Sequence, residues 1–573
     1  MPNFFKDNQD LQFTLNNLEM AEVAGLREAN YKFAKEFDSA PVDLADAMDN
    51  YNRVLDIVGG VCGDNIEPRS RQVDQEGPHF EDGVVTYHPL TQKNLKDIQL
   101  ADVNGVMLPH QYGGLNFPVT VYTMMTEMVS RADGSLQNLF GLQDIAETIS
   151  EFGTDEQKAD FLPRFASGEV DGAMDLTEPD SGSDLQSVRL RAWQDEKGNW
   201  FLNGMKRFIT NGCAQVHLVL ARSEDGTVDG RGLSMFICEA CPELVVRRIE
   251  DKLGIHGVAT CELQYNDVPA LLCGQRRRGL TRYVMSLMNG ARVAISAQAL
   301  GIAEAAYREA RKYAEEREQF KKTIDQFPAV YDMLVKMKTK TLAARTLLYE
   351  TTRIVDLRNG YTHLVENTPA KELDPEIRKK QKYYNKVAAV LTPMAKACCT
   401  EISNEVTYDA IQIHGGTGFM RDFNVERYSR DARITNIYEG TTQLQVVAAI
   451  GGVIQRTNDV RIAEFAALPF EGKLLRLKKK VDKLHEQQLK AVKYIAEKKD
   501  PSYHDLRARS LVEMETYIFV GYMMLRDALK DTEREVLAER YILDAEPEFK
   551  KRYIEVLGGD ISIIDNHRDI IDY

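Results

Sequence analysis

The feature that most constrains the fold of this chain is a change in its sequence period. Up to about residue 172, apolar residues recur at a spacing of about 3.6, as in 18–37 and 117–152, which is typical of amphipathic helices. From residue 173 the chain carries short β-favouring runs separated by turn dipeptides such as Asn203-Gly204. Beyond residue 279 the helical period returns. This order predicts a mainly helical α+β protein with a β domain between helical ones.

The changes of period also suggest domain limits. We expect an N-terminal α-helical domain at 1–172, an antiparallel β-barrel domain at 173–280, a four-helix bundle at 281–455 and an extra C-terminal helical domain at 456–573. The β-favouring runs are spaced as in a barrel or sandwich, at 200–202, 207–210, 217–221, 233–238, 244–249 and 261–265. Helices are expected at 291–319, 329–358 and 375–414, with loops at 59–89 and 362–374.

Length, charge and cysteine content exclude several classes of protein. The 573 residues, 43% of them hydrophobic, can build their cores without disulfide support. The formal net charge of -15 disfavours broad binding to a nucleic-acid backbone. No transmembrane segment is expected, because an apolar stretch such as 517–525 is about half of the roughly 18 to 20 residues that cross a bilayer. A cytoplasmic location is expected, since the start lacks a secretory signal and the eight cysteines form no disulfide pattern.

Cysteines and histidines offer alternative sites that the pattern does not favour. Cys238 and Cys241 have the spacing of a zinc knuckle, but Cys261 and Cys273 do not form the second knuckle. We therefore expect strand-end and core cysteines and no metal. Two histidines that lie beside glycines are interpreted as structural, His256 and His414.

A glycine-rich segment near residue 415 has a feature of phosphate-binding sites. Gly415 and Gly416 follow a helical stretch, and glycines at such a place let backbone N–H groups approach a phosphate closely. No strand precedes them, so the segment is not the dinucleotide-binding fingerprint of a Rossmann fold. Alone, this pair of glycines is weak evidence for a cofactor.

Four longer sequence blocks are more specific, and they occur in a fixed order. They are Leu176-Thr-Glu-Pro-Asp-Ser-Gly-Ser-Asp184, Asn203-Gly-Met-Lys-Arg-Phe-Ile-Thr-Asn-Gly212, Tyr313-Ala-Glu-Glu-Arg-Glu-Gln-Phe320 and Tyr438-Glu-Gly-Thr441. Together they resemble the acyl-CoA dehydrogenase family over about residues 90–452. The segments 362–381 and 391–396 and the extra C-terminal section are similar to its long bacterial branch, which includes the 3-methylmercaptopropionyl-CoA dehydrogenases.

The resemblance implies a flavoprotein oxidoreductase of fatty acid metabolism that uses FAD and desaturates an acyl-CoA thioester. The family pattern makes Glu439 the base that removes the Cα proton, while hydride passes from Cβ to FAD and electrons leave to an electron-transfer flavoprotein. Exclusion of water would raise the pKa of such a carboxylate. Some relatives carry the base on the helix around 289–292, but Ala291 stands at that place here, which favours Glu439.

The resemblance also assigns residues to the cofactor and to the substrate. The implied cofactor-binding residues are Leu176, Thr177, Gly182, Ser183, Phe208, Thr210, Arg317, Gln319, Phe320, Gln412, Gly415, Gly416, Thr441 and Gln443. The implied substrate-binding residues are Ser183, Asn289, Arg292, Glu439 and Gly440. In the family, the block around Arg317 reaches the FAD of the neighbouring subunit, so a homodimer or homotetramer is implied.

Two other functions share part of this pattern. An acyl-CoA oxidase that uses oxygen has the same fold, but no feature of the sequence indicates an oxygen channel. A nucleic-acid-binding relative with incidental dehydrogenase activity needs a basic surface, which the charge disfavours. The acyl group stays open, because methionines at 124–128 and 285–288 predict an adaptable apolar wall that does not distinguish short straight, sulfur-containing and cyclic chains.

Overall fold

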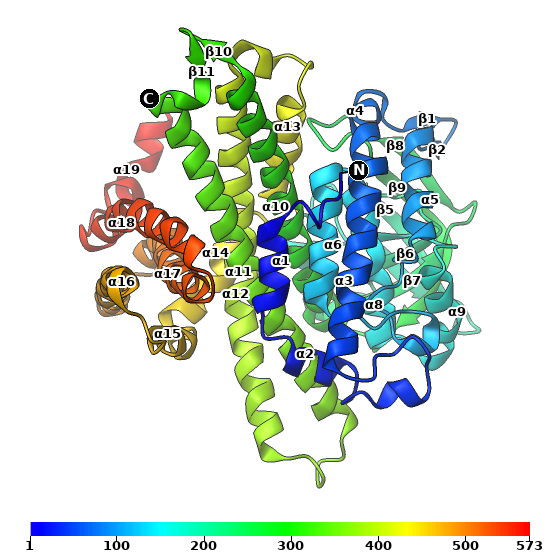
Figure 1. Ribbon diagram of the computed structural model, residues 1–573. Coiled ribbons are helices and arrows are strands. Elements are labelled where there is room, and N and C mark those ends of the chain that lie inside the picture. Colours follow the sequence, from blue (N-terminus) through cyan, green and yellow to red (C-terminus); the bar gives the residue numbers. More distant parts are fainter. Residues whose placement is uncertain (1) are drawn as a thin grey trace.

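Helices dominate the structure and accompany one seven-stranded sheet (Figure 1). The computed structural model describes residues 2–573. The sheet lies on one side of a group of long helices, and the C-terminal helices lie on the other side (Figure 1). This arrangement confirms the predicted α+β, mainly helical class, with helical regions before and after a central β region.

The N-terminal region is built from helices that pack against the long helix α10 (Met285–Glu316) and against the sheet. Helix α6 is buried along nearly its whole length beside α10, which confirms the helical prediction for 117–152. The helices are α1 (Gln9–Asn17), α2 (Ala21–Arg27), α3 (Leu44–Gly60), α4 (Glu67–Glu76), α5 (Pro89–Leu100), α6 (Val119–Ala132), α7 (Leu136–Phe140), α8 (Asp144–Phe152) and α9 (Asp155–Ala166).

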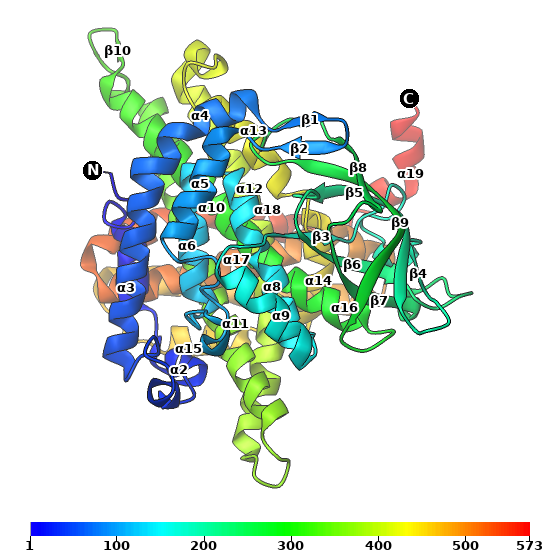
Figure 2. The ribbon, with the colours of Figure 1, turned by 90° about the vertical axis from the view of Figure 1, so that its right-hand side faces the viewer.

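The predicted loop at 59–89 is wrong over most of its length. Helix α3 continues through a π-helical turn, Val61–Ile66, directly into α4. Cys62, Ile66 and Val73 are fully buried along this stretch, so packing overrides the turn-forming composition. The wider π turn precedes Pro68, which has no N–H for a regular helix. Turn chemistry decides only the end, where β1 (His79–Glu81) and β2 (Val84–Thr86) form a hairpin beside β8 (Leu244–Ile249) (Figure 2).

The sheet closes on itself, as the barrel prediction requires. Strands β6, β4, β5, β9 and β7 pair in a ring because β7 returns to β6, while β3 and β8 add to its outside. All pairings are antiparallel except those of β6 with β3 and β4. The strands, besides β8, are β3 (Gly172–Asp175), β4 (Arg191–Gln194), β5 (Trp200–Thr210), β6 (Val216–Arg222), β7 (Leu233–Glu239) and β9 (Thr260–Cys273).

Long helices follow the sheet, and one of them has the bounds that the sequence predicts. Helix α12 (Pro375–His414) begins where the Asp374 carboxylate accepts a hydrogen bond from the Glu376 backbone N–H. Helix α11 (Pro328–Asn367) is longer than predicted, so the loop expected from 362 starts after Asn367, because Tyr361 is buried. The β10–β11 hairpin, α13 and α14 complete the region, at Glu318–Gln319, Lys322–Thr323, Val425–Thr435 and Thr442–Ile454.

The C-terminal helices are joined to this group by a buried ionic cluster. Glu350 of α11 is 1% exposed and accepts hydrogen bonds from Arg353 (3.0 Å), Arg461 (2.6 Å) and Arg526 (3.0 Å). Three guanidinium groups hold the pKa of Glu350 well below its usual range, against the effect of burial. In residues 2–573, no helix is long and apolar enough to span a membrane. The helices are α15 (Asp459–Ala466), α16 (Gly472–Lys498), α17 (Pro501–Lys530), α18 (Glu535–Leu557) and α19 (Ser562–Ile571).

Candidate active site

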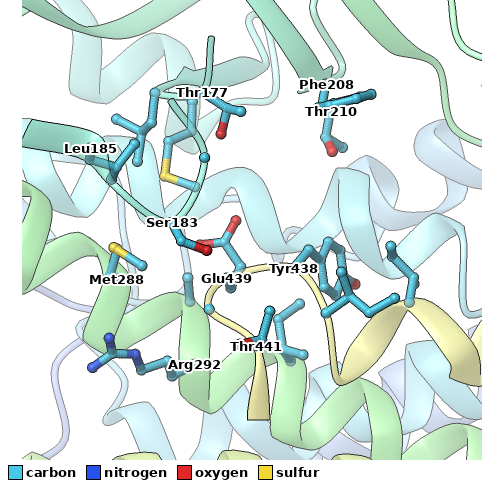
Figure 3. A pocket seen from close by; sticks show the side chains of 18 of the residues that line it. Thr177, Ser183, Leu185, Phe208, Thr210, Met288, Arg292, Tyr438, Glu439 and Thr441 are labelled. Atoms are coloured by element: carbon cyan, nitrogen blue, oxygen red, sulfur yellow. The ribbon is translucent and has the colours of Figure 1, made fainter. Parts of the chain in front are cut away.

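A cavity of about 1240 Å³ lies between the barrel and the helices. Its walls come from the loop after β3, from β5, from α7 and α8, from the start of α10, and from the segment that joins α13 to α14. Glu439 points into this space, across from Thr177 and Ser183 (Figure 3). The cavity therefore brings together segments that are up to about 300 residues apart in the sequence, such as Asn138 and Tyr438.

The turn that carries Glu439 is unusual and is held by buried side chains. Glu439 and Gly440 both have left-handed backbone conformations, with φ of 54° and 93°. For Glu439 this conformation is strained, so the surrounding structure must hold it. The Gln445 carboxamide donates to the carbonyl oxygens of Glu439 (3.2 Å) and Gly440 (2.9 Å), and the Lys396 ammonium donates to the latter at 2.7 Å. The turn thus aims the carboxylate at the cavity.

The electrostatic surroundings of Glu439 act in opposite directions. Burial raises the pKa of Glu439, while the nearby cations Lys396 and Arg292 lower it; burial has the larger effect. Burial also lowers the pKa of Lys396, to about 7, and Glu439 partly opposes that shift. The Glu439 carboxylate is therefore a base of raised pKa beside a lysine that changes charge near neutral pH.

The loop after β3 is fixed by a buried lysine that sequence reasoning did not single out. Lys206 donates to the Leu176 carbonyl oxygen (2.8 Å) and to the Glu178 carboxylate (3.0 Å). Glu178 in turn accepts from the backbone N–H groups of Arg189 and Leu190. Lys206 is fully buried, and it holds the loop that places Thr177 and Ser183 on the cavity wall.

A register shift in β5 turns the side chain of Phe208 toward the cavity. The pairing of β5 with β9 is irregular between Lys206 and Ile209, and Phe208 has a φ of 61°. The ring is 52% exposed, with the Arg207 guanidinium 4.6 Å from its centre. Such bulges re-aim side chains beside functional sites. Here the bulge puts Phe208 and Thr210 on the same cavity wall (Figure 3).

The structure gathers most of the predicted site residues, but in two cavities. The large cavity is lined by Leu176, Thr177, Gly182, Ser183, Phe208, Thr210, Arg292, Glu439, Gly440 and Thr441. A second cavity of about 660 Å³ is lined by Arg317, Gln319, Phe320, Gly415 and Gly416. Phe320 is 88% exposed there. In a single chain these two groups of predicted cofactor-binding residues do not meet.

Three predicted residues line neither cavity. Gln412 and Gln443 are exposed on α12 and α14. Asn289 accepts a hydrogen bond from Arg292 (3.1 Å) and so orients that guanidinium. The expected methionine wall is half correct, because Met285 and Met288 line the large cavity. The methionines of α6 at 124–128 are instead buried in the core, since α6 turns that face to α10.

The alternative cysteine and histidine sites have structural surroundings. Cys238 is buried at the end of β7, and residues 2–573 contain no group of three or more His, Cys, Asp or Glu side chains arranged to hold a metal. His256 lies beside Asp74 (3.2 Å) and bonds the Lys252 carbonyl oxygen (2.7 Å), outside the large cavity. His414 stacks on Tyr313, with 4.2 Å between the ring centres.

Sequence reasoning missed several polar residues at the large cavity or directly behind it. Lys396, behind the Glu439 turn, gives one signal, a charged residue within the apolar run of α12. Gln137, Asn138 and Asp144 also line the cavity, and only a knowledge of the fold reveals that they do.

Family models cover most of the chain. Residues 49–169, 173–268 and 293–443 match the N-terminal, middle and C-terminal domains of acyl-CoA dehydrogenase. Residues 457–557 match a further model described as acyl-CoA dehydrogenase C terminal.

Individual relatives agree with these matches. The chain is 34% identical to 3-methylmercaptopropionyl-CoA dehydrogenase of Ruegeria pomeroyi, over 74% of this chain and 73% of the relative. It is 37% identical to an acyl-CoA dehydrogenase of Bacillus subtilis, over 60% of this chain and 84% of the relative. The solved butyryl-CoA dehydrogenase of Megasphaera elsdenii is similar with a TM-score of 0.61 and 28% identity, over 71% of this chain and 98% of that one. An acyl-CoA dehydrogenase from Bacillus anthracis shares the fold over 89% of this chain and 88% of that one, with a TM-score of 0.75 and 24% identity.

Proposed function

Because the chain belongs to the acyl-CoA dehydrogenase family, we propose that it desaturates an acyl-CoA thioester to the trans-2-enoyl-CoA with Glu439 as the base. The observation that carries this proposal is the Glu439 carboxylate, held on the cavity wall by a strained turn and with a raised pKa. A raised pKa makes the ionised carboxylate a stronger base, which the weakly acidic Cα–H of a thioester requires. The test is anaerobic bleaching of the flavin by an acyl-CoA.

The charge that develops on the thioester oxygen needs hydrogen-bond donors at the same place. Within residues 2–573, the backbone N–H of Glu439 has no acceptor, so it is free to donate to the substrate carbonyl. Arg292 and Lys396 add positive charge beside Glu439. These cations keep the carboxylate ionised at a lower pH than burial alone would allow, and they favour an enolate in the same space.

FAD is the cofactor that we propose, and the residues of the cavity fit it. A volume of about 1240 Å³ exceeds the roughly 300 to 1,000 Å³ of a site for one small ligand, which leaves room for a thioester beside a ring system. A Cβ atom added to Gly182, Gly415 or Gly416 would meet no other residue within 4 Å, apart from the neighbours in the chain. The backbones of these glycines are therefore open to a ligand. Thr177 and Thr210 would hold the ring system. Bound FAD would supply the acceptor for the hydride from Cβ.

We further propose that two subunits complete each cofactor site. The observation that supports this is the separation of the predicted cofactor-binding residues into two cavities of one chain. Arg317, Phe320 and Gly415 line the second cavity, and Phe320 is largely exposed there. A homodimer, or a dimer of dimers, would bring this cavity of one subunit to the large cavity of another.

A complementation experiment tests the shared site. Arg317→Ala and Glu439→Gln are each expected to inactivate the homo-oligomer, the first by weakening FAD binding and the second by removing the base. Co-expression with two different affinity tags gives mixed dimers, in which one site combines the intact Arg317 with the intact Glu439. We expect about half of the wild-type activity per mixed dimer, because one of two sites is intact. Inactive mixed dimers that retain FAD would place Arg317 in its own subunit's site.

Replacing Lys396 tests the electrostatic account of Glu439. In Lys396→Met the pKa of Glu439 should rise, because a cation that lowers it is gone. We expect the acid limb of the kcat/KM profile to move to higher pH by about one unit. Lys386→Met, an exposed lysine of the same helix, is the control and should leave the profile unchanged. Superimposable profiles for wild type and Lys396→Met would contradict the account.

The proposed electron acceptor is an electron-transfer flavoprotein. One similar solved structure, 31% identical with a TM-score of 0.60, comes from work on the electron transferring flavoprotein of Acidaminococcus fermentans. The alternative is an acyl-CoA oxidase. Stoichiometric hydrogen peroxide formation under air, with no added acceptor, would favour that alternative.

A further inference from the structure

The wall of the large cavity beside Glu439 carries polar side chains among apolar ones such as Leu142 and Ile145. Helices α7 and α8 contribute Gln137, Asn138 and Asp144 to this wall. Asn138 accepts a hydrogen bond from Tyr438, the residue before Glu439, at 3.3 Å. The proposed function puts the reacting Cα at the Glu439 carboxylate, and Glu439 is close enough to Asp144 to raise the pKa of that residue, so the acyl group lies near this wall.

Two of these side chains are buried with hydrogen-bonding groups unused. Gln137 is 2% exposed and Asn138 is 7% exposed. The Gln137 Oε1 has no partner within residues 2–573. Its Nε2 lies only 2.7 Å from the point that a Cβ atom would occupy if Gly141 had a side chain. The absence of a side chain at Gly141 is therefore what makes room for this carboxamide.

Asn138 is oriented by its neighbours so that its donor stays free. Its Oδ1 accepts from the Gln298 carboxamide (2.6 Å) and from Tyr438. These bonds fix the amide, and its Nδ2 has no partner within residues 2–573. Both unused atoms lie buried beneath the cavity surface, so these two amides form a polar layer behind the wall.

The carboxyl group of Asp144 adds a third polar group. It forms no hydrogen bond or ion pair within residues 2–573. It lies 3.6 Å from the point that a Cβ atom would occupy if Gly290 of α10 had a side chain. Burial raises the pKa of Asp144 well above its usual range, and the carboxylates of Glu147 and Glu439 add to the shift. The protonated group can donate a hydrogen bond, whereas a negatively charged acyl group would be repelled by the carboxylates around it.

We propose that Asp144, at the cavity wall in front of Gln137 and Asn138, selects acyl-CoA thioesters whose acyl group carries a neutral hydrogen-bonding substituent, such as a hydroxyl. This inference rests on the proposed dehydrogenase function and names its substrate class. A plain alkyl chain would leave the Asp144 carboxyl group without a partner, and sites built from such groups reject analogues that cannot bond to them.

The experiment compares thioesters of matched length in single-turnover flavin reduction. At each of several chain lengths the panel contains the alkyl-, ω-hydroxy-, ω-carboxy- and ω-amino-acyl-CoA. The quantity compared is the rate constant of flavin reduction divided by the dissociation constant of the thioester. For the best ω-hydroxyacyl-CoA we expect this ratio to be at least about 10-fold higher than for the alkyl thioester of equal heavy-atom number. The ω-carboxy compounds should be the poorest. Equal or faster reduction by the alkyl series overturns the inference and leaves the proposed function intact, whereas bleaching by no thioester removes both.

Variants connect the preference to the polar wall. Asp144→Leu should reduce the hydroxyl-to-alkyl ratio at least about 5-fold, and it should also raise the melting temperature, because an unpartnered carboxyl group is removed. Glu151→Leu, on the same helix but outside the cavity lining, is the matched control and should keep the ratio. An unchanged ratio in Asp144→Leu contradicts the inference. Loss of FAD with an equal loss of rate on every thioester also contradicts it, because Asp144 would then serve the cofactor.

Discussion

Replacing Glu439 by Gln is expected to leave FAD bound and to lower the rate of flavin reduction by an acyl-CoA at least about 10³-fold. The substitution keeps the size of the side chain and removes the only group with which the residue can take the Cα proton. The turn should persist, because its supporting hydrogen bonds come from Gln445 and Lys396 and reach the backbone. Stopped-flow absorbance under anaerobic conditions measures the rate.

The matched control for this prediction is Glu405→Gln. Glu405 lies on α12 and pairs with Lys340 at the surface (2.5 Å), away from the cavity lining. Its reduction rate should stay within about twofold of the wild-type rate. A Glu439→Gln enzyme that still reduces its flavin at a rate near wild type would show that another group is the base. Asp144 would then be the first carboxyl group to examine, since it lines the same cavity.

The largest expected effect on stability comes from Glu350→Gln. The three arginines around Glu350 would be left buried or half-buried without their common anion, which costs about 3–5 kcal/mol. Because Arg353 lies on α11, Arg461 on α15 and Arg526 on α17, the loss should also loosen the C-terminal helices from α11. Urea unfolding monitored by circular dichroism, together with limited proteolysis, measures both effects.

The stability difference between wild type and Glu350→Gln should also depend on pH in a defined direction. The pKa of Glu350 is lower in the folded protein than in the unfolded chain, where it is about 4.3. The stability that Glu350 contributes is therefore complete above its pKa in the unfolded chain. It is lost as the pH falls through its pKa in the folded protein. The difference between wild type and Glu350→Gln should be largest near pH 7 and shrink below about pH 4.

Glu464→Gln serves as the control for this cluster. Glu464 bonds the same Arg461 but is 51% exposed, so its removal should cost about 0–1 kcal/mol. A Glu350→Gln protein less than about 1 kcal/mol below wild type would mean that the buried cluster does not anchor the C-terminal helices.

Parts of the fold with strong local signals were predictable from the sequence. Helix α12 has the predicted bounds because Asp374 and Pro375 begin it and Gly415, with a φ of 60°, ends it. The stretch around Cys62 and Ile66 was not predictable, since its polar, turn-forming composition is overridden by burial against distant residues. Local sequence therefore determines where a helix such as α12 begins and ends, whereas tertiary packing determines that a helix continues through a segment such as 61–66.

The candidate site likewise contains residues that the local sequence identifies and residues that only the fold brings together. Glu439, Thr177 and Phe208 stand in short linear motifs, so a resemblance finds them. The side chains that support or complete the site act across long separations: Lys396 bonds residue 440 and Asn138 bonds residue 438. Neither pair is visible without the fold, because nothing in the local sequence of one partner identifies the other.

In the proposed reaction, an acyl-CoA thioester gives up its Cα proton to Glu439 and reduces the bound flavin. The most direct measurement is an anaerobic titration of the purified, FAD-loaded protein with the panel of acyl-CoA thioesters, followed by flavin absorbance. We expect at least one thioester to bleach the flavin stoichiometrically, with the enoyl-CoA appearing in equal amount. An FAD-loaded protein whose absorbance no thioester in the panel changes would contradict it.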